Sequence, residues 1–430
     1  MNIKKLKAFE RGFNEFMAST YADIKEYEQR VQDIAEEVKK NGDQAVFAFT
    51  RRFDGAEITP DNFRVSDAEI EAAYESVDDD YIFAIQAAID NIASFHAKQL
   101  RNSWMEPDDR GNILGQIFRP LERVGIYVPG GTAAYPSSVL MNAIPAQVAG
   151  VAEIAMVTPP DKDGKLNPYT LVAAAELGLE EIYKMGGAQA VFALAWGTES
   201  VKKVDLISGP GNIYVTLAKK KVYGDVNIDM LAGPSEILII ADSQADPAYL
   251  AADMMSQAEH DVLARSILVC ESLELINRVE EELEKQVQEM SRRDIIIKSL
   301  EDHGALILVD DLREACQVAN LVAPEHLELM VENPFQWLHR IKNAGAIFMG
   351  KYTPEPVGDY YAGPNHILPT GGTARFYSPV TVDTFIKATS LLFYSPQGLY
   401  DDGDDIIKLA MVEGLTAHAN SVRVRKGKDR

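Results

Sequence analysis

One segment of the chain places an amide and an imidazole where they can share a metal ion. In DMMSQAEHD, Gln257 and His260 are three residues apart, so a helix would put them on one face. Imidazole nitrogen is a common zinc ligand, and amide oxygen is a rarer one. The pair can form half of a zinc site, but polar pairs on helices more often belong to a solvated face.

A second segment, APEHLEL, places Glu325 directly before His326. Adjacent side chains point in different directions, so the two cannot chelate one ion together. Because His and Glu are the usual general bases of enzymes, they could serve two separate proton transfers in one cleft. Taken alone, the segment is more typical of a helix start with a glutamate in its first turn.

Two later segments add further candidate groups. Asp359 and His366 lie in a long stretch rich in Gly, Pro and Tyr, and an ordered loop of this kind is usually functional. In VEGLTAHAN, Glu413 ends a helical pattern, Gly414 is a plausible cap, and His418 follows. Four nitrogen and oxygen donors are then available for zinc: Gln257, His260, Asp359 and His418. Three groups remain for acid–base or polar roles: Glu325, His326 and Glu413.

Composition excludes several other classes of function. The 430 residues carry a net charge of −23, which disfavours binding to nucleic acid and anionic membranes. Cys270 and Cys316 are the only cysteines, so a disulfide framework or thiolate zinc site is excluded, and both are expected to be buried. The chain lacks a secretory or membrane-spanning pattern, which indicates the cytosol. The remaining histidines are expected at the surface: His96, His303 and His339.

The elements that must position these groups follow an α/β pattern. The first hundred residues have helical periodicity, and from Arg123 apolar strands alternate with alanine-rich helices. A second pattern adds helices over 246–258, about 273–290 and 311–321, between strands such as SILVC and ALILVD. A terminal helix over about 405–413 leads into a basic tail. This alternation predicts βαβ units and parallel sheets buried on both faces.

Eight segments together resemble the histidinol dehydrogenase family, in the family's order over about residues 35–425. They are GDQAVFAFTRRFDG, ERVGIYVPGGTAAYPSSVLMNAIPAQVAGV, KMGGAQAVFALAWGTESVKKVDLISGPGN, DMLAGPSEILIIAD, SQAEHD, APEHLEL, VGDYYAGPNHILPTGGTARFYSPVTVDTF and EGLTAHANSVRVR.

The resemblance implies a role for each candidate residue. One zinc ion per subunit would be held by Gln257, His260, Asp359 and His418. The proton acceptors would be Glu325 and His326. Substrate contacts would come from the zinc ligands, His326, Ser235 and Glu413, with His366 as an additional pocket residue. NAD would contact Tyr127, Gln189 and Asn212, although neither VPGGTAAYPSS nor SGPGN is a GxGxxG fingerprint.

The family architecture implies an α/β fold with two incomplete Rossmann-like, parallel-sheet domains and small helical extensions at both ends. The expected divisions are 1–27 for the N-terminal extension, 28–125 plus 235–380 for the domain with most zinc and catalytic residues, 126–234 for the NAD side, and 381–430 for the C-terminal extension. In the family's homodimer this last segment reaches the partner's active site, so Glu413 and His418 would come from the other subunit.

The implied activity is the oxidation of L-histidinol to L-histidine through L-histidinaldehyde, in two successive NAD-dependent steps. One alternative is a zinc and NAD dehydrogenase of the same family that acts on another polar alcohol, such as a sulfonated diol. Ser235, Glu413 and the segment EGLTAH favour histidinol. Another alternative is a non-enzymatic α/β ligand-binding protein, against which the Glu325–His326 pair argues.

Overall fold

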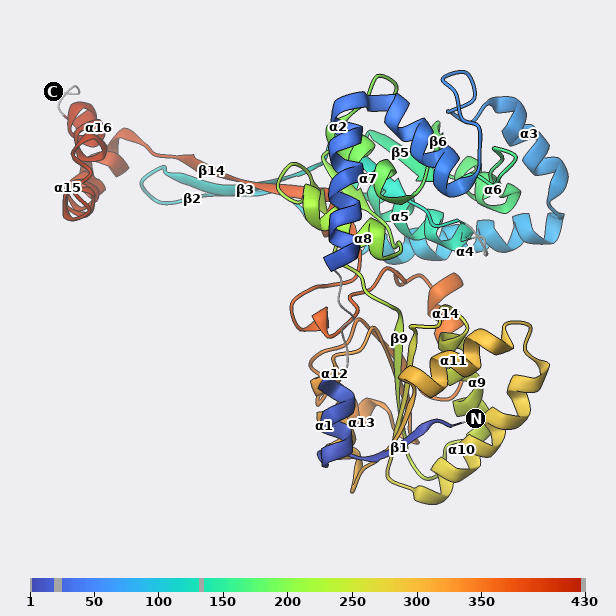
Figure 1. Ribbon diagram of the computed structural model, residues 1–430. Coiled ribbons are helices and arrows are strands. Elements are labelled where there is room, and N and C mark those ends of the chain that lie inside the picture. The colour runs from blue at the N-terminus through green and yellow to red at the C-terminus, as the bar shows by residue number, and fades with distance from the viewer. Residues whose placement is uncertain (1, 19–24, 131–134, 427–430) are drawn as a thin grey trace. The chain divides into compact units, whose positions relative to one another are not determined.

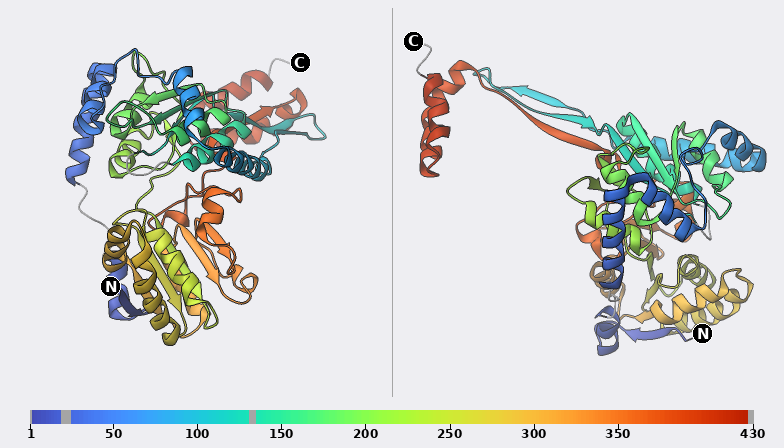
Figure 2. Two further views of the ribbon diagram at one scale, coloured as in Figure 1. Left: turned by 90° about the vertical axis from the view of Figure 1, so that its right-hand side faces the viewer. Right: turned by 45° about the horizontal axis from the view of Figure 1, so that its top comes forward.

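The computed structural model describes residues 2–18, 25–130 and 135–426, which form two compact units. The first comprises Met1–Gln99 and Leu121–Phe385, and the second comprises Leu100–Pro120 and Ile386–Arg430. Parts of the predicted extensions 1–27 and 381–430, and residues 131–134 of the predicted glycine turn, lie outside the described residues. Figures 1 and 2 show the helices and strands of both units.

A five-stranded parallel sheet in the first unit has the strand order β6-β5-β4-β7-β8. The strands are β4 (Arg123–Tyr127), β5 (Glu153–Thr158), β6 (Glu181–Lys184), β7 (Leu206–Ser208) and β8 (Asn227–Ile228). The connecting helices are α5 (Pro136–Ala149), α6 (Pro168–Glu176), α7 (Gly187–Trp196) and α8 (Ile213–Val222). The strand order reverses between β4 and β7, and ligands of doubly wound folds bind beyond the carboxyl ends of strands at such a point.

Three N-terminal helices pack against this same five-stranded half: α2 (Lys25–Asp54), α3 (Asp67–Ser76) and α4 (Asp79–Ala97). Val31, Ile34 and Val38 form the apolar stripe of α2 within the core around β4 and β5. The expected grouping of 28–125 with 235–380 stays a prediction. Periodicity reveals an apolar face but not which of two sheets will cover it.

A six-stranded parallel sheet forms the other half of the first unit, in the order β1-β11-β10-β9-β12-β13. The strands are β1 (Lys4–Lys7), β9 (Glu236–Ala241), β10 (Arg265–Cys270), β11 (Ala305–Leu308), β12 (His326–Met330) and β13 (Ala346–Met349). The N-terminal segment therefore supplies an edge strand, whereas a purely helical extension was expected. The first three residues of β1 (Lys-Lys-Leu) are too charged to show the apolar alternation that predicts a strand.

Helices cover both faces of the six-stranded sheet. One apolar core contains α9 (Pro247–Ala258), α10 (Leu273–Gln286) and α11 (Arg293–His303), and the opposite core contains α1 (Arg11–Ala18) and α12 (Leu312–Val322). Shorter helical pieces are η1 (Val287–Glu289), α13 (Phe335–Leu338), α14 (Glu355–Tyr360), η2 (Thr373–Arg375) and η3 (Val382–Phe385). The predicted α/β class with two parallel sheets is confirmed.

The second unit combines an antiparallel sheet with two helices (Figure 1). Its sheet has the order β14-β3-β2, formed by β2 (Trp104–Pro107), β3 (Ile113–Pro120) and β14 (Ile386–Phe393). Helix α15 (Pro396–Val412) begins earlier than the predicted 405, and residues 421–426 of the predicted basic tail belong to α16 (Thr416–Lys426). Ser395 explains the early start, because its hydroxyl accepts from the amide of Gly398 and Pro396 follows it.

Two expectations about side-chain burial are decided by the structure. Cys270 and Cys316 are buried, as predicted. His96 is fully buried, so its surface assignment is wrong: its charged sequence neighbours lie on other faces of α4, while His96 continues the inward stripe of Ile85 and Ile92. No helix within the described ranges is long and apolar enough to span a membrane.

Candidate active site

The start of β9 holds the acid–base pair in place. The backbone amide of Glu236 donates to Oε2 of Glu325 at 2.8 Å, and the carbonyl oxygen of Glu236 lies 3.2 Å from Nδ1 of His326. Because a carbonyl only accepts hydrogen bonds, Nδ1 is the protonated nitrogen of neutral His326. His326 begins strand β12, so the alternative of a helix start at this segment is excluded.

Negative groups surround the His326 ring. Nε2 lies 3.5 Å from Oδ1 of Asp359, and Nδ1 lies 3.7 Å from Glu325 and 3.9 Å from Glu355. Burial opposes the charged imidazolium, but the charges of Glu355 and Glu325 raise the pKa of His326 well above its usual value. Burial also raises the pKa of Glu325 to about 8. Glu325 is therefore suited to exchange a proton near neutral pH, and the carboxylates around His326 favour its protonated form.

Helix α9 brings a buried amide to the same region. Asp246 caps the helix, as predicted, by accepting from the amide of Ala248 at 2.9 Å. Gln257 in the last turn is fully buried, and neither its Oε1 nor its Nε2 has a hydrogen-bond partner among the described residues. A buried amide without partners is costly, so this side chain is arranged for a ligand. His260 follows the helix end, and burial lowers its pKa although Asp359 opposes that shift.

Asp359 on α14 belongs to a possible metal cluster. Ligand atoms of His326, Glu355 and Asp359 all lie within 4.8 Å of one another. Burial would raise the pKa of Asp359, but the hydrogen bond and charge of His326 lower it. Of the predicted zinc ligands only Asp359 is in this cluster. Sequence reasoning missed Glu355, although its position four residues before Asp359 on one helix was a usable signal.

His366 and Ser235 lie next to this centre. Nδ1 of His366 is 3.0 Å from the carbonyl oxygen of Asp359, and Nε2 is 3.3 Å from the hydroxyl of Ser138 on α5. Burial lowers the pKa of His366, so the neutral ring is favoured. Ser235 directly precedes Glu236, which contacts both members of the acid–base pair. His366 therefore contacts the backbone of Asp359, and Ser235 is the sequence neighbour of Glu236.

Two further predicted site residues, Glu413 and His418, belong to the second unit. Glu413 caps the end of α15, and His418 lies in the first turn of α16. Both side chains are exposed. Neither belongs to the cluster of His326, Glu355 and Asp359, so the predicted four-ligand set is divided between the two units of one chain.

A second set of polar groups gathers beyond the carboxyl ends of the five-stranded sheet. The hydroxyl of Tyr127, at the end of β4, accepts from the amide of Gly187 at 3.0 Å. Gln189 is buried, and its amide nitrogen and oxygen both lack hydrogen-bond partners within the described part of the chain. Asn212 is exposed and caps α8 through the amide of Tyr214 at 3.0 Å.

The turn after β7 approaches β4 closely at this point. A Cβ on Gly209 would lie 2.1 Å from the carbonyl oxygen of Tyr127, and φ at Gly209 is +127°, so glycine is required. Lys219 and Asp229 form a buried ion pair that fixes this turn. Lys219 Nζ donates to the carbonyl of Gly209 at 2.9 Å, and the amide of Gly209 donates to Asp229 at 2.8 Å. The reversal of strand order and the unpartnered Gln189 make this end of the sheet a candidate ligand site.

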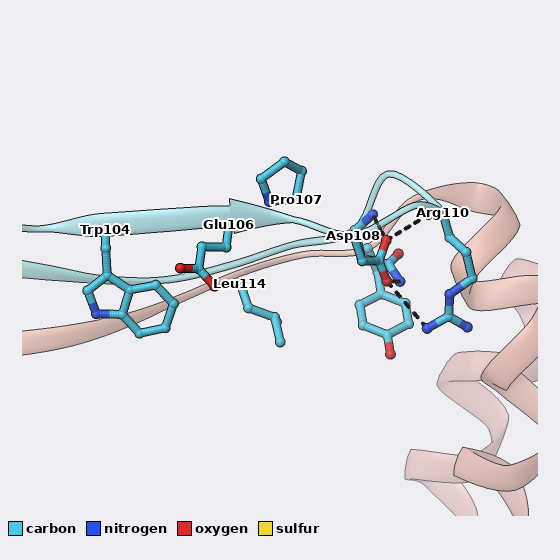
Figure 3. A pocket seen from close by; sticks show the side chains of 8 residues that line it. Trp104, Glu106, Pro107, Asp108, Arg110 and Leu114 are labelled. Atoms are coloured by element: carbon cyan, nitrogen blue, oxygen red, sulfur yellow. Dashed lines mark hydrogen bonds and ion pairs between the residues drawn. The ribbon is translucent and has the colours of Figure 1, made fainter.

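Of two cavities in the described structure, one contains a predicted site residue and the other does not. One of about 290 Å³ in the first unit is lined by Asp359 together with apolar side chains that include Phe348, Val357 and Leu368. Another of about 380 Å³ lies on the second unit between Trp104, Glu106 and Arg110 (Figure 3). The dashed bonds there join Arg110 to Asp108 and close the hairpin turn. The second cavity contains none of the predicted site residues.

The two parallel sheets and a buried Glu–His pair beside a carboxylate cluster define an α/β enzyme. Residues 17–426 match the sequence profile of histidinol dehydrogenase. The chain is 60% identical over 396 residues to a histidinol dehydrogenase of Heliobacterium mobile, covering 92% of this chain and 93% of that protein. It is 56% identical over 398 residues to one of Carboxydothermus hydrogenoformans, covering 93% of each.

A solved structure gives the same result. The crystal structure of histidinol dehydrogenase from Elizabethkingia anophelis superposes with a TM-score of 0.92 at 39% identity, covering 98% of each chain. The chain therefore belongs to the histidinol dehydrogenase family. It is an enzyme, and the alternative of a non-enzymatic binding protein is rejected.

Proposed function

We propose that this protein oxidises L-histidinol to L-histidine through L-histidinaldehyde, in two successive NAD-dependent steps. Two relatives above half identity over more than nine-tenths of the chain carry the name histidinol dehydrogenase. The observation that carries the proposal is the buried pair of Glu325 and His326, hydrogen-bonded to Glu236 and adjacent to Asp359. Two proton acceptors suit a reaction with two chemically different steps.

The donor groups fit a zinc ion. The amide of Gln257 supports this, since both of its polar atoms are buried without a hydrogen bond in the described structure. The carboxylate of Asp359 adds an oxygen ligand of the kind that zinc accepts. In the proposal Gln257, His260 and Asp359 hold the ion, with His418 supplied by a second copy of the chain. When bound, zinc would hold the nitrogen atoms of the substrate and so fix the alcohol carbon in place.

The protein groups move the protons. Nε2 of His326 carries the free lone pair, so it accepts the hydroxyl proton in the first step. Glu325 then removes a proton from the water that adds to the aldehyde, and His326 acts again in the second oxidation. Ser235, His366 and the partner's Glu413 would contact the substrate. General acid–base catalysis of this kind typically contributes about 10²–10⁴ in rate.

NAD would bind at the reversal of strand order in the five-stranded sheet. Tyr127 and Asn212 belong to the loops after β4 and β7, and Gln189 offers a buried amide without partners. The cofactor would supply the hydride acceptor for both oxidations. This assignment makes residues 126–234 the NAD side, as expected from the sequence.

A homodimer with shared active sites is the proposed assembly, with one zinc ion per subunit. The second unit exposes many large apolar side chains, which is typical of an interface. They include Trp104, Met105, Leu114, Leu392, Phe393, Leu409 and Val412. We also propose a cytosolic location without nucleic-acid or membrane partners, on the basis of the net charge of −23.

The test is the yield of NADH from a limiting amount of L-histidinol. Two NADH per histidinol, with histidine as product, are expected. A sulfonated diol supplied under the same conditions tests the alternative substrate. Turnover of the diol without turnover of histidinol would overturn the proposed substrate.

A further inference from the structure

Glu328 is a buried carboxylate on strand β12, two residues after His326 of the proposed site. It follows His326 by two residues on β12, so both side chains lie on the same face of the sheet. The Glu328 side chain is only 1% exposed, and its Oε1 accepts from the backbone amide of Glu355 at 3.0 Å. Glu355 is the first residue of α14, whose amide has no acceptor within its own helix.

This hydrogen bond connects two elements of the site. Strand β12 carries His326, and α14 carries Asp359 one helical turn after Glu355. The bond therefore fixes where the first turn of α14 sits on the sheet. Asp359 moves with that turn, because the whole helix comprises only Glu355–Tyr360.

A third element, helix α9, also carries a group that interacts with Glu328. The carboxyl group of Asp253 on α9 interacts electrostatically with Glu328. Asp253 is four residues before Gln257, so the two side chains share one face of α9. Glu328 thus lies where the three elements that carry Gln257, His326 and Asp359 come together.

We propose that Glu328 is a positioning residue for the metal site, an inference that rests on the proposed function. In this role it sets the location of Asp359 relative to Gln257 by anchoring α14 to β12. Residues that orient ligands in this way typically change metal affinity by about 10–100-fold when replaced.

The first test compares two replacements by zinc competition with a chelator. Glu328→Gln keeps an oxygen that can accept from the Glu355 amide, whereas Glu328→Met removes it at similar size. Zinc affinity should fall by about 10–100-fold in Glu328→Met and remain within about threefold of wild type in Glu328→Gln. Unchanged affinity in the Met variant, or equal loss in both variants, would overturn the proposal.

A second pair of variants tests the donor of the same hydrogen bond. It keeps the proposal testable if Glu328→Met fails to fold. Glu355→Ala and Glu355→Pro both remove the side chain, but only proline removes the backbone N–H. Proline is accepted at the first position of a helix. The Pro variant should bind zinc about tenfold more weakly than the Ala variant. Equal affinities of the two would contradict the role of Glu328.

Leu329→Ala is the control for general destabilisation. Leu329 is buried on the opposite face of β12, so this variant should lower the melting temperature and leave zinc affinity unchanged. A parallel loss of zinc affinity in Leu329→Ala would show that Glu328 acts only through stability. Wild-type protein that binds no zinc would instead refute the zinc site of the proposed function.

Discussion

The carbonyl oxygen of Glu236 lies 3.2 Å from Nδ1 of His326, and this contact decides which ring nitrogen is free. With one proton held on Nδ1, Nε2 is the nitrogen that gains or loses the second proton, and it lies 3.5 Å from Oδ1 of Asp359. The amide of the same Glu236 holds Glu325. One backbone residue at the start of β9 therefore orients both proposed proton acceptors.

Replacing Glu325 should separate the two oxidation steps. In Glu325→Gln the activation of water is lost, so oxidation of histidinaldehyde should fall by about 10²–10⁴ while oxidation of histidinol changes far less. NADH formation from each substrate in single-turnover reactions measures the two steps. His326→Asn is the matched comparison and should impair both. Equal loss of both steps in Glu325→Gln would remove its assigned role.

Removal of metal should abolish activity reversibly. A chelator is expected to remove zinc from the proposed ligands. Because the protein should stay folded without the metal, added zinc should restore turnover. Metal content and NADH formation followed on the same sample provide the measurement. Full activity in protein shown to be metal-free would refute the metal's role.

Mixing two inactive variants should restore activity if His418 acts across subunits. In a mixed dimer of His418→Ala and His326→Asn, one of the two sites receives an intact His326 and an intact His418. Random reassociation should then recover about one quarter of wild-type activity. The readout is NADH formation after the subunits have been exchanged. If His418 served its own chain, every site in the mixture would remain defective.

The Gln189 amide should contribute to NAD binding. Gln189→Ala removes one buried polar contact with the cofactor, so KM for NAD should rise about tenfold. Steady-state kinetics at saturating histidinol measure this, and KM for histidinol should stay unchanged. A variant with unaltered KM for NAD would exclude Gln189 from the cofactor site.

Asp54 should make stability depend on pH. It ends α2 partly buried, and burial raises its pKa from 3.8 to about 6. The charged carboxylate therefore destabilises the fold fully above about pH 6, and the effect disappears below pH 3.8. Discounted for solvent screening, Asp54→Asn should stabilise the protein by about 1 kcal/mol at neutral pH.

Melting temperatures of wild type and Asp54→Asn measure this effect across pH. The difference between them should be largest at neutral pH and should shrink steadily as the solution becomes more acidic. A difference that grows toward acid pH would have the wrong sign and would exclude burial of a charged Asp54 as its cause.

Local sequence signals predicted much of the scaffold. Asp246 and Pro247 mark the start of α9 correctly, and the apolar run ending at Cys270 is β10. Such features depend on capping groups and on burial of both faces of a strand, which are properties of a few adjacent residues. These local signals were enough to place Gln257 in α9 and His260 just after it.

Features that depend on long-range partners were not predicted. Glu328 is an alternating polar position that a sequence pattern assigns to solvent, yet Glu355 and Asp253 cover it. His96 is buried because α4 packs on α5, and the chain gives no local sign of that contact. The resemblance to a family supplied the zinc and NAD residues, which spacing alone left open.

The position of β1 affects how the chain can fold during synthesis. Lys4 pairs with Ala305 at the edge of the six-stranded sheet, so the first strand made waits for a partner that lies some three hundred residues later. At the usual speed of a ribosome this delay is about 15–60 s. The five-stranded half is complete at Ile228 and can fold in that interval. Throughout this interval β1 has no strand to pair with.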